Sequence, residues 1–195
     1  DGEFEMYYSG GTTETVTPTL NFADAESDLK LTLKHRYNFD YYSGMSTAYN
    51  GGQVLISTDD GDNWELFTPE GGYPGTMYNY AFYANPLYNQ AGFVHCGDCS
   101  GVSGTASDNE DKYIETVFDM ADYVGETEVK LKFQVGMYRY QYPGDGEHWY
   151  IDSLAFTGTG MESVAFEEIV AISGAAGPFV SGEKFEYSKD YHFQV

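Results

Sequence analysis

The sequence predicts an all-β protein, and three observations support this prediction. Apolar and polar residues alternate over short segments, which is the pattern of strands with one buried and one solvated face. Turn-forming residues separate these segments. Of the 195 residues, 23 are Gly, and both Asp-Gly pairs and Asn-rich stretches recur along the chain. No segment keeps a helical period for more than one or two turns. We therefore expect short antiparallel strands joined by tight turns.

The clearest strands are two segments of strict alternation. Residues 29–34 read Leu-Lys-Leu-Thr-Leu-Lys, and residues 129–135 read Val-Lys-Leu-Lys-Phe-Gln-Val. Each segment is expected to bury its apolar face against a core. Further strands are expected at residues 112–118 and 149–156. Residues 13–20 are predicted to form an edge strand, because they contain a proline, which cannot donate to a sheet ladder.

A β-hairpin is predicted at residues 53–67. Its two strands, 53–58 and 64–67, flank an Asp-Asp-Gly-Asp-Asn turn. This acidic turn has the composition of a calcium loop but is too short for an EF-hand, so we interpret it as the hairpin turn. Trp64 and Trp149 both follow turns and enter strands, where large rings usually fill the edge of the core. We therefore expect both indoles to be buried at the edge of the core, in preference to the alternative that they form platforms for sugar binding.

The charge balance excludes several classes of function. The chain has 9 Lys and Arg against 31 Asp and Glu, a formal net charge of −22. Binding to nucleic acid or to an anionic membrane surface needs clustered cations, which such a composition lacks. No apolar run approaches the roughly 18 residues of a membrane span. Surplus carboxylates are relieved by salt or by divalent cations, which favours a secreted or cell-surface setting.

Residues 71–111 form a long Gly- and Tyr-rich insertion. They lack sustained periodicity and are too long for an ordinary connection, so we expect an elaborated surface loop with short strands of its own. Cys96 and Cys99 lie inside it at C-x-x-C spacing, which is compatible with a disulfide, a metal half-site with His95, or free thiols. The extracellular setting favours the disulfide, and the local sequence supplies no fourth zinc ligand.

Catalytic motifs are missing from the sequence. It contains no Gly-x-Ser-x-Gly elbow, no His-Glu-x-x-His motif and no phosphate-binding Gly-rich loop before a helix. The four histidines, His35, His95, His148 and His192, lie in different segments and are interpreted as ordinary strand or loop residues. We therefore predict no catalytic residues and do not expect an enzyme.

Alternating tyrosines are the candidate ligand-binding residues. Tyr138, Tyr140 and Tyr142 would share one face of a strand if the strand at residues 129–135 extends that far. Exposed tyrosines stack on sugar rings or anchor protein interfaces at low entropic cost. The alternative is that tyrosines of this kind pack loops onto the sandwich.

The order of the segments resembles a known module. Residues 31–39, 51–64, 129–135 and 149–154 follow one another with a Ser-Thr-Asp-x-Gly-x-x-Trp hairpin and a Trp-Tyr-Ile-Asp strand, and residues 2–5 read Gly-Glu-Phe-Glu. This order resembles the MAM-like jelly-roll module of secreted bacterial and archaeal proteins, including metallopeptidases of the immune inhibitor A type. The resemblance implies an antiparallel two-sheet jelly-roll sandwich that is not catalytic and is related to carbohydrate-binding and adhesion domains.

The resemblance also implies a calcium ion that pins the first strand to the last. Its likeliest ligands are Glu5 and Asp152, with Glu3 and Asp40 as weaker candidates. A half-buried carboxylate at Asp152 would be costly unless it were paired or coordinated. The alternative is that Asp152 caps a turn or accepts backbone hydrogen bonds.

Two units are expected along the chain. Residues 1–158 match the module, and residues 159–195 read as a linker followed by an alternating segment. This C-terminal extension is expected to begin another β domain or to pair with a second copy, giving a homo-oligomer. The leading hypothesis is a non-catalytic, calcium-stabilised module that serves adhesion or structural assembly with other protein subunits. The alternative is a carbohydrate-binding module, with surface glycans as partners, attached to a secreted polysaccharide-active enzyme or peptidase.

Overall fold

The computed structural model describes residues 11–39, 47–77, 85–94, 113–137, 148–159 and 164–172. These residues hold eleven strands and one turn of 3-10 helix. The elements are β1 (Gly11–Val16), β2 (Lys30–Asn38), β3 (Thr47–Ala48), β4 (Gly51–Ser57), β5 (Glu65–Leu66), β6 (Gly75–Met77), β7 (Ala91–Gly92), β8 (Ile114–Asp119), η2 (Ala121–Tyr123), β9 (Lys130–Met137), β10 (His148–Thr157) and β11 (Val164–Ile172).

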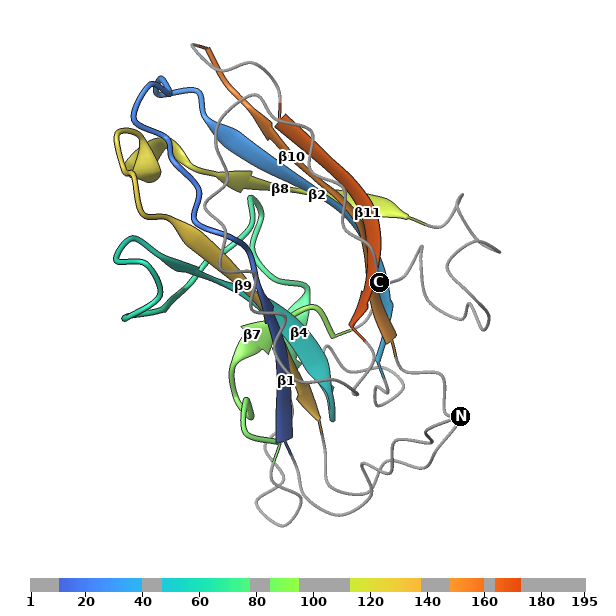
Figure 1. The fold of residues 1–195 in the computed structure, drawn as a ribbon. Coiled ribbons are helices and arrows are strands. Elements are labelled where there is room, and N and C mark those ends of the chain that lie inside the picture. Colours follow the sequence, from blue (N-terminus) through green and yellow to red (C-terminus); the bar gives the residue numbers. More distant parts are fainter. Residues whose placement is uncertain are drawn as a thin grey trace, which may run out of the picture.

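Two four-stranded antiparallel sheets face each other. The first, here the β4 sheet, has the order β1-β9-β4-β5, and the second, the β2 sheet, has the order β11-β10-β2-β8. Figure 1 shows the two sheets as the layers of a sandwich, with the β2 sheet above and the β4 sheet below. The prediction of an all-β antiparallel sandwich is confirmed, and each strand predicted between residues 13 and 156 has a counterpart. Strand β11 was not predicted, because it lies where a linker was expected, and the alternating segment near the C-terminus lies outside the described residues.

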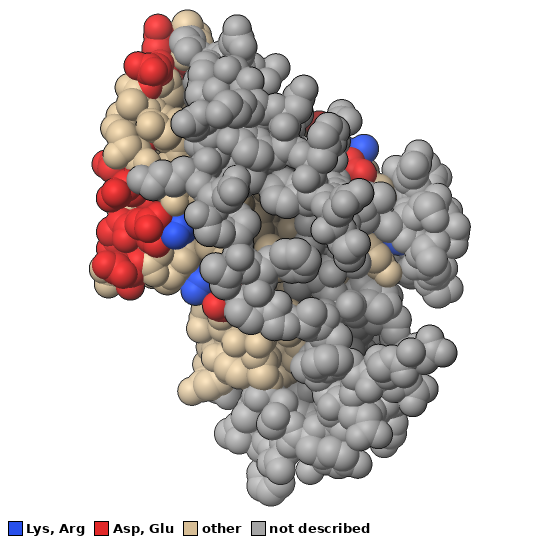
Figure 2. Space-filling view, viewed as in Figure 1, with Lys and Arg blue, Asp and Glu red and all other residues tan. Residues whose placement is uncertain are grey.

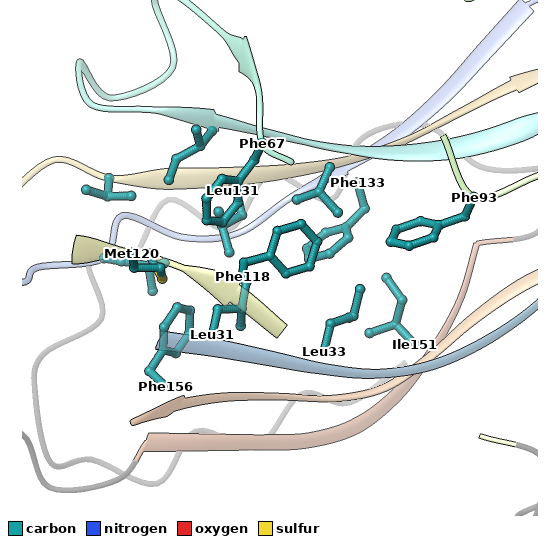
Figure 3. Close-up of a cluster of buried hydrophobic side chains, with 14 of the residues drawn as sticks. Leu31, Leu33, Phe67, Phe93, Phe118, Met120, Leu131, Phe133, Ile151 and Phe156 are labelled. Carbon is teal, nitrogen blue, oxygen red and sulfur yellow. The ribbon is translucent and has the colours of Figure 1, made fainter. Parts of the chain in front are cut away.

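The core lies between the two sheets and follows from strand alternation. In β2, Leu31 and Leu33 are fully buried while Lys30 and Lys34 are partly exposed, so successive side chains face opposite sides. Phe133 on β9 reaches the same core from the opposite sheet. Figure 3 shows these side chains meeting between the layers, together with Phe118 on β8. Burial of each such side chain stabilises the fold by about 1.5–3 kcal/mol.

The predicted hairpin is confirmed, and its turn is closed by its own side chains. Asp60 and Gly61 have positive φ angles of 57° and 99°, which reverse the chain tightly. The Asp59 carboxylate accepts hydrogen bonds from the Asn63 backbone N–H at 2.8 Å, from the Asn63 side-chain amide at 2.6 Å and from the Ser57 hydroxyl at 2.7 Å. These bonds, chiefly those from Asn63, lower the pKa of Asp59 to about 2. The turn thus uses its carboxylate to hold the hairpin.

The predicted edge position of the first strand is also confirmed. Within the described ranges β1 pairs only with β9, and Pro18 follows the end of β1.

At the other sheet, the edge strand β8 is covered by the chain after β5, because the Glu70 N–H donates to the Val117 carbonyl at 2.8 Å. The β2 sheet continues past Gly158, because β11 pairs antiparallel with β10. The division of the chain into two units stays a prediction.

The insertion forms short strands, as expected, and packs onto the outer face of the β4 sheet. Its strands β6 and β7 make a small sheet with β3, in which β3 and β6 are parallel. Met77, Leu87 and Val94 form a second buried cluster above two paired glycines, Gly51 and Gly136. A Cβ on Gly51 would lie 2.9 Å from Met77 Cγ, and one on Gly136 would lie 2.9 Å from Leu87. The insertion can approach the sheet because these positions lack side chains.

The prediction that both indoles are buried is right for Trp149 and wrong for Trp64. Trp149 is fully buried. Trp64 is half-buried on the outer face of the β4 sheet, where Lys132 Nζ lies 4.2 Å from its ring centroid. Alternation explains the difference, because Trp64 precedes β5 and shares the face of Leu66, which is 40% exposed.

We expect Gly52→Ala to lower the free energy of unfolding by about 1–3 kcal/mol, because overpacking a filled core forces neighbours to move. The new Cβ would lie 2.6 Å from Cε3 of Trp149, a rigid ring buried on all sides. Thr58→Ala is the control, since Thr58 is exposed one residue after the end of β4 and its replacement should change stability little. Urea denaturation measures both variants. Equal losses of stability would show that the indole does not set the constraint.

Candidate binding site

A depression of about 460 Å³ opens between the edge strand β8 and the segment that covers it. Its lining includes the partly exposed Tyr73, the buried Tyr37 and Phe93 behind it, and the exposed residues Glu70 and Glu115. A volume of this size suits a small ligand such as one sugar ring. The residues come from β2, β8, the chain after β5 and the chain after β7, so the fold assembles the depression from distant parts of the sequence.

Tyr73 fixes the wall of the depression. Its hydroxyl donates to the Phe67 carbonyl at 2.7 Å and accepts from the Val54 N–H at 2.9 Å. Its ring meets Phe93 edge to face with centroids 4.9 Å apart. Burial raises the pKa of the Tyr73 hydroxyl, so it stays protonated and keeps both bonds. The covering segment is therefore tied to the β4 sheet at its base.

The rim carries an ion pair and an exposed carboxylate. Glu70 pairs with Lys30 on β2, and the Glu70 backbone bonds to β8. Glu115 is exposed on β8. Carboxylates beside aromatic rings can accept hydrogen bonds from hydroxyl groups of a bound ligand.

Below the depression, a chain of hydrogen bonds engages both ring nitrogens of His35. Trp149 Nε1 donates to His35 Nδ1 at 2.9 Å, so Nδ1 must be the acceptor nitrogen. His35 Nε2 therefore carries the proton and donates to Thr116 Oγ1 at 2.8 Å. His35 is fully buried, and burial lowers its pKa to about 3. The imidazole stays neutral at physiological pH and serves as a structural link between β10 and β8.

A second polar cluster lies on the outer face of the β2 sheet. The Arg36 guanidinium is 2% exposed, and it lies over the Tyr150 ring at 4.3 Å and the Tyr113 ring at 5.5 Å from the centroids. Lys34 Nζ pairs with Asp152 at 2.8 Å beside them. Strand register creates this cluster, because Arg36 pairs with Tyr150, and the pairing of β2 with β8 places Tyr113 on its other side.

Asp152 reaches Lys34 because β10 contains a bulge. Ile151 pairs with His35 and Ser153 pairs with Lys34, so Asp152 is an extra residue in β10. A bulge of this kind re-aims a side chain without ending the strand. The predicted cost of an unpaired Asp152 carboxylate is therefore offset by a lysine.

The predicted calcium ligands can be assessed at one position. Asp152 is engaged by Lys34, and across the described ranges no group of three or more acidic, His or Cys side chains gathers to hold a metal ion. These residues therefore do not fit a calcium site on their own, and calcium binding stays a prediction. The remaining predicted site residues lie outside the described residues: Glu3, Glu5, Asp40, Tyr138, Tyr140, Tyr142, Cys96 and Cys99.

Exposed carboxylates gather at one end of the sandwich. Figure 2 shows them along the left edge of that view, over the loops that join the strands. Backbone hydrogen bonds hold these loops together, from Phe22 to Glu126 and from Asp60 to Glu128. Asp24 is one of the exposed acidic residues on them. The negative charge of this end repels polyanions.

Sequence reasoning missed the aromatic wall and Arg36. The wall joins Tyr73 and Phe93 from the insertion to β2, and no local pattern predicts that contact. Arg36 had a usable signal, because it is one of only 9 basic residues in a chain with 31 acidic ones. A scarce cation in a strand flanked by buried positions is a reasonable candidate for a specific role.

Comparison with known proteins does not assign the chain to a family. No protein-family model matches it, and no curated protein shows significant similarity. Among the described residues, no helix is long and apolar enough to cross a membrane. The resemblance to the MAM-like module therefore stays a prediction, and the function is argued from the site.

We expect the stability of the protein to fall as the pH drops from 6.5 to 4.5. The folded-state pKa of His35 is about 3 and its ordinary value is 6.5, so in this range the unfolded chain takes up a proton that the folded protein does not. The free energy of unfolding should then decrease by up to roughly 1.4 kcal/mol per pH unit from this residue. This loss of stability occurs at a higher pH than the titration of Asp59, whose pKa is about 2.

Urea denaturation of the parent and of His35→Gln at pH 7.5, 6.5, 5.5 and 4.5 measures this dependence. The difference between the two unfolding free energies isolates His35 from the other three histidines. Parallel pH profiles for the two proteins would show that His35 is not the group responsible.

Proposed function

We propose that this protein is a non-catalytic β-sandwich module that works outside the cell or on its surface, in adhesion or structural assembly. The observation that carries the proposal is the depression beside β8, which has aromatic walls and a carboxylate rim. The buried imidazole below it is neutral and fully hydrogen-bonded, which suits a structural role better than acid–base catalysis. The fold we propose at the finer level is the jelly roll of MAM-like modules.

The open edge of the β2 sheet adds support for an assembly role. Strand β11 (Val164–Ile172) is the outer strand of that sheet and, within the described ranges, pairs only with β10. An outer strand of nine residues offers a row of backbone groups to an added strand. Assembly through this edge would be independent of the depression.

Carbohydrate binding is the second candidate function, and the contents of the depression favour it. Tyr73 is the partly exposed aromatic residue of the depression's lining, backed by the buried rings of Tyr37 and Phe93, and the exposed Glu115 offers hydrogen-bond acceptors. Sugars present apolar ring faces and hydroxyl donors together, so this combination matches their chemistry. The module would then bring a secreted enzyme or peptidase to a glycan surface.

We expect the native protein to be found in the medium or on the cell surface, with Cys96 and Cys99 joined in a disulfide. Oxidising compartments favour such a bond, and the acidic composition suits a saline setting. Cell fractionation and non-reducing peptide mass spectrometry measure location and thiol state. A cytoplasmic protein with both thiols reduced would contradict the proposed setting.

If the second candidate is right, Glu115→Gln should weaken glycan binding about tenfold, because a charge-assisted hydrogen bond is worth about 1.5–3 kcal/mol. Glu128→Gln is the matched control, since Glu128 is exposed at the acidic end, away from the depression. Screening on a glycan array followed by calorimetry gives both affinities. A parent protein that binds no glycan, or equal affinities for the two variants, would leave only the adhesion or assembly proposal.

A further inference from the structure

Arg36 differs from the other cations of the described structure. Each of the four lysines among the described residues pairs with a carboxylate: Lys30 with Glu70, Lys34 with Asp152, Lys130 with Asp60 and Lys132 with Glu14. Arg36 has no such partner in the part of the chain that the structure describes. Its Nε, Nη1 and Nη2 atoms are all buried without a hydrogen-bond acceptor. In a chain of net charge −22, carboxylates far outnumber cations, so a buried cation without a carboxylate partner is unexpected.

The neighbouring hydroxyl is in the same situation. Tyr113 Oη is buried and also lacks a hydrogen-bond partner. Burial raises the pKa of Tyr113 and the adjacent Arg36 guanidinium lowers it by less, so the hydroxyl stays protonated, and its closest polar neighbour is the guanidinium, which cannot accept its proton. Arg36 and Tyr113 thus place several unsatisfied donors together on one face of the β2 sheet. Contacts with the Tyr113 and Tyr150 rings stabilise the guanidinium charge only in part.

Leaving these donors unsatisfied is costly. A guanidinium is charged at every accessible pH, and a buried charge without a partner is strongly unfavourable. Two carboxylates of the described residues share this face, Asp152, which is held by Lys34, and Glu115, which pairs with Lys34 in the strand register, and neither is bonded to Arg36. An acceptor from elsewhere would remove the penalty, and the planar fork of Arg matches an oxyanion with two oxygens.

We propose that Arg36 and Tyr113 form a binding site for a carboxylate-bearing sugar on the outer face of the β2 sheet. One buried positive charge balances one negative charge, so a carboxylate fits this site better than a phosphate dianion. Singly charged ligands also meet less repulsion than polyanions from a chain of net charge −22. The site is separate from the depression beside β8, so it does not depend on the function proposed for that depression.

Access to the site requires a side-chain movement. Tyr113 lies one residue before β8 begins, outside the paired ladder, and it is partly exposed. Its ring is one of the two that lie against the guanidinium, the other being that of Tyr150 on β10, so entry of a ligand would involve a shift of the Tyr113 side chain. The carboxylate then accepts from Arg36 and from the Tyr113 hydroxyl.

The test is thermal unfolding of the full chain at pH 7 and constant ionic strength, with galacturonate or galactose as the probe. These two sugars differ in the carboxylate, so galacturonate should raise the melting temperature of the parent in a saturable way and galactose should not. Arg36→Met should weaken galacturonate binding at least tenfold and Tyr113→Phe severalfold. Lys132→Met is the control, because it removes a cation over an aromatic ring on the other sheet and should leave binding unchanged.

The melting temperatures of the variants without ligand show whether the carboxylate that Arg36 binds comes from a ligand or from the chain itself. If the carboxylate belongs to a ligand, Arg36→Met and Tyr113→Phe should melt at or above the parent's temperature, because each removes unsatisfied donors. A folded Arg36→Met that melts many degrees lower would show that the chain supplies the carboxylate, and would overturn the proposal. Coincident curves for galacturonate and galactose would also overturn it. If Arg36→Met does not fold, the test rests on Tyr113→Phe. Galacturonate binding by Tyr113→Phe as tight as that of the parent would then overturn the proposal.

Discussion

The contact between Trp149 and Gly52 determines how closely the two sheets approach. Trp149 projects from β10 into the space where Gly52 on β4 has no side chain, and its Nε1 is held by His35. The indole therefore contacts the β4 sheet, while the hydrogen bond to His35, on its own β2 sheet, fixes its orientation. Rings of Phe93 and Phe133 pack around it with centroids 5.5 Å and 5.8 Å away. Because Thr116 continues the hydrogen bonds to β8, the position of the candidate binding site depends on this one side chain.

Glycines have a related role on the other face of the same strands. Gly52 admits the indole on the inner face, whereas its neighbour Gly51 and the paired Gly136 admit the insertion on the outer face. Asn85 strengthens the outer contact through hydrogen bonds from its side-chain amide to the carbonyls of Tyr49 and Gly136. The β4 sheet thus supports a hydrophobic cluster on each side, and the insertion brings Phe93 to the depression through that second contact.

The sequence was sufficient to predict the strands between residues 13 and 156, but not β11 or the contacts between distant segments. Alternation at residues 29–34 and 129–135 places the core residues of β2 and β9, because a period of two leaves one arrangement with a buried face. Trp64 is an exception, because it shares the face of Leu66, an apolar residue that the structure places on the outside. Arg36 reads as an ordinary outward residue, because its burial depends on Tyr113 and Tyr150, which are far away in sequence. The wall at Tyr73 depends in the same way on tertiary packing.

The bulge at Asp152 has a consequence for how this strand can change during evolution. Ile151 and Leu154 contact the core on either side of the bulge, so a regular strand without Asp152 would keep both residues facing inward. Loss or gain of this single residue therefore leaves the alternation of β10 in phase. Insertions elsewhere in the strand would turn its apolar residues toward water. The outer face of the β2 sheet can thus acquire or lose a carboxylate while the folding pattern of the strand is kept.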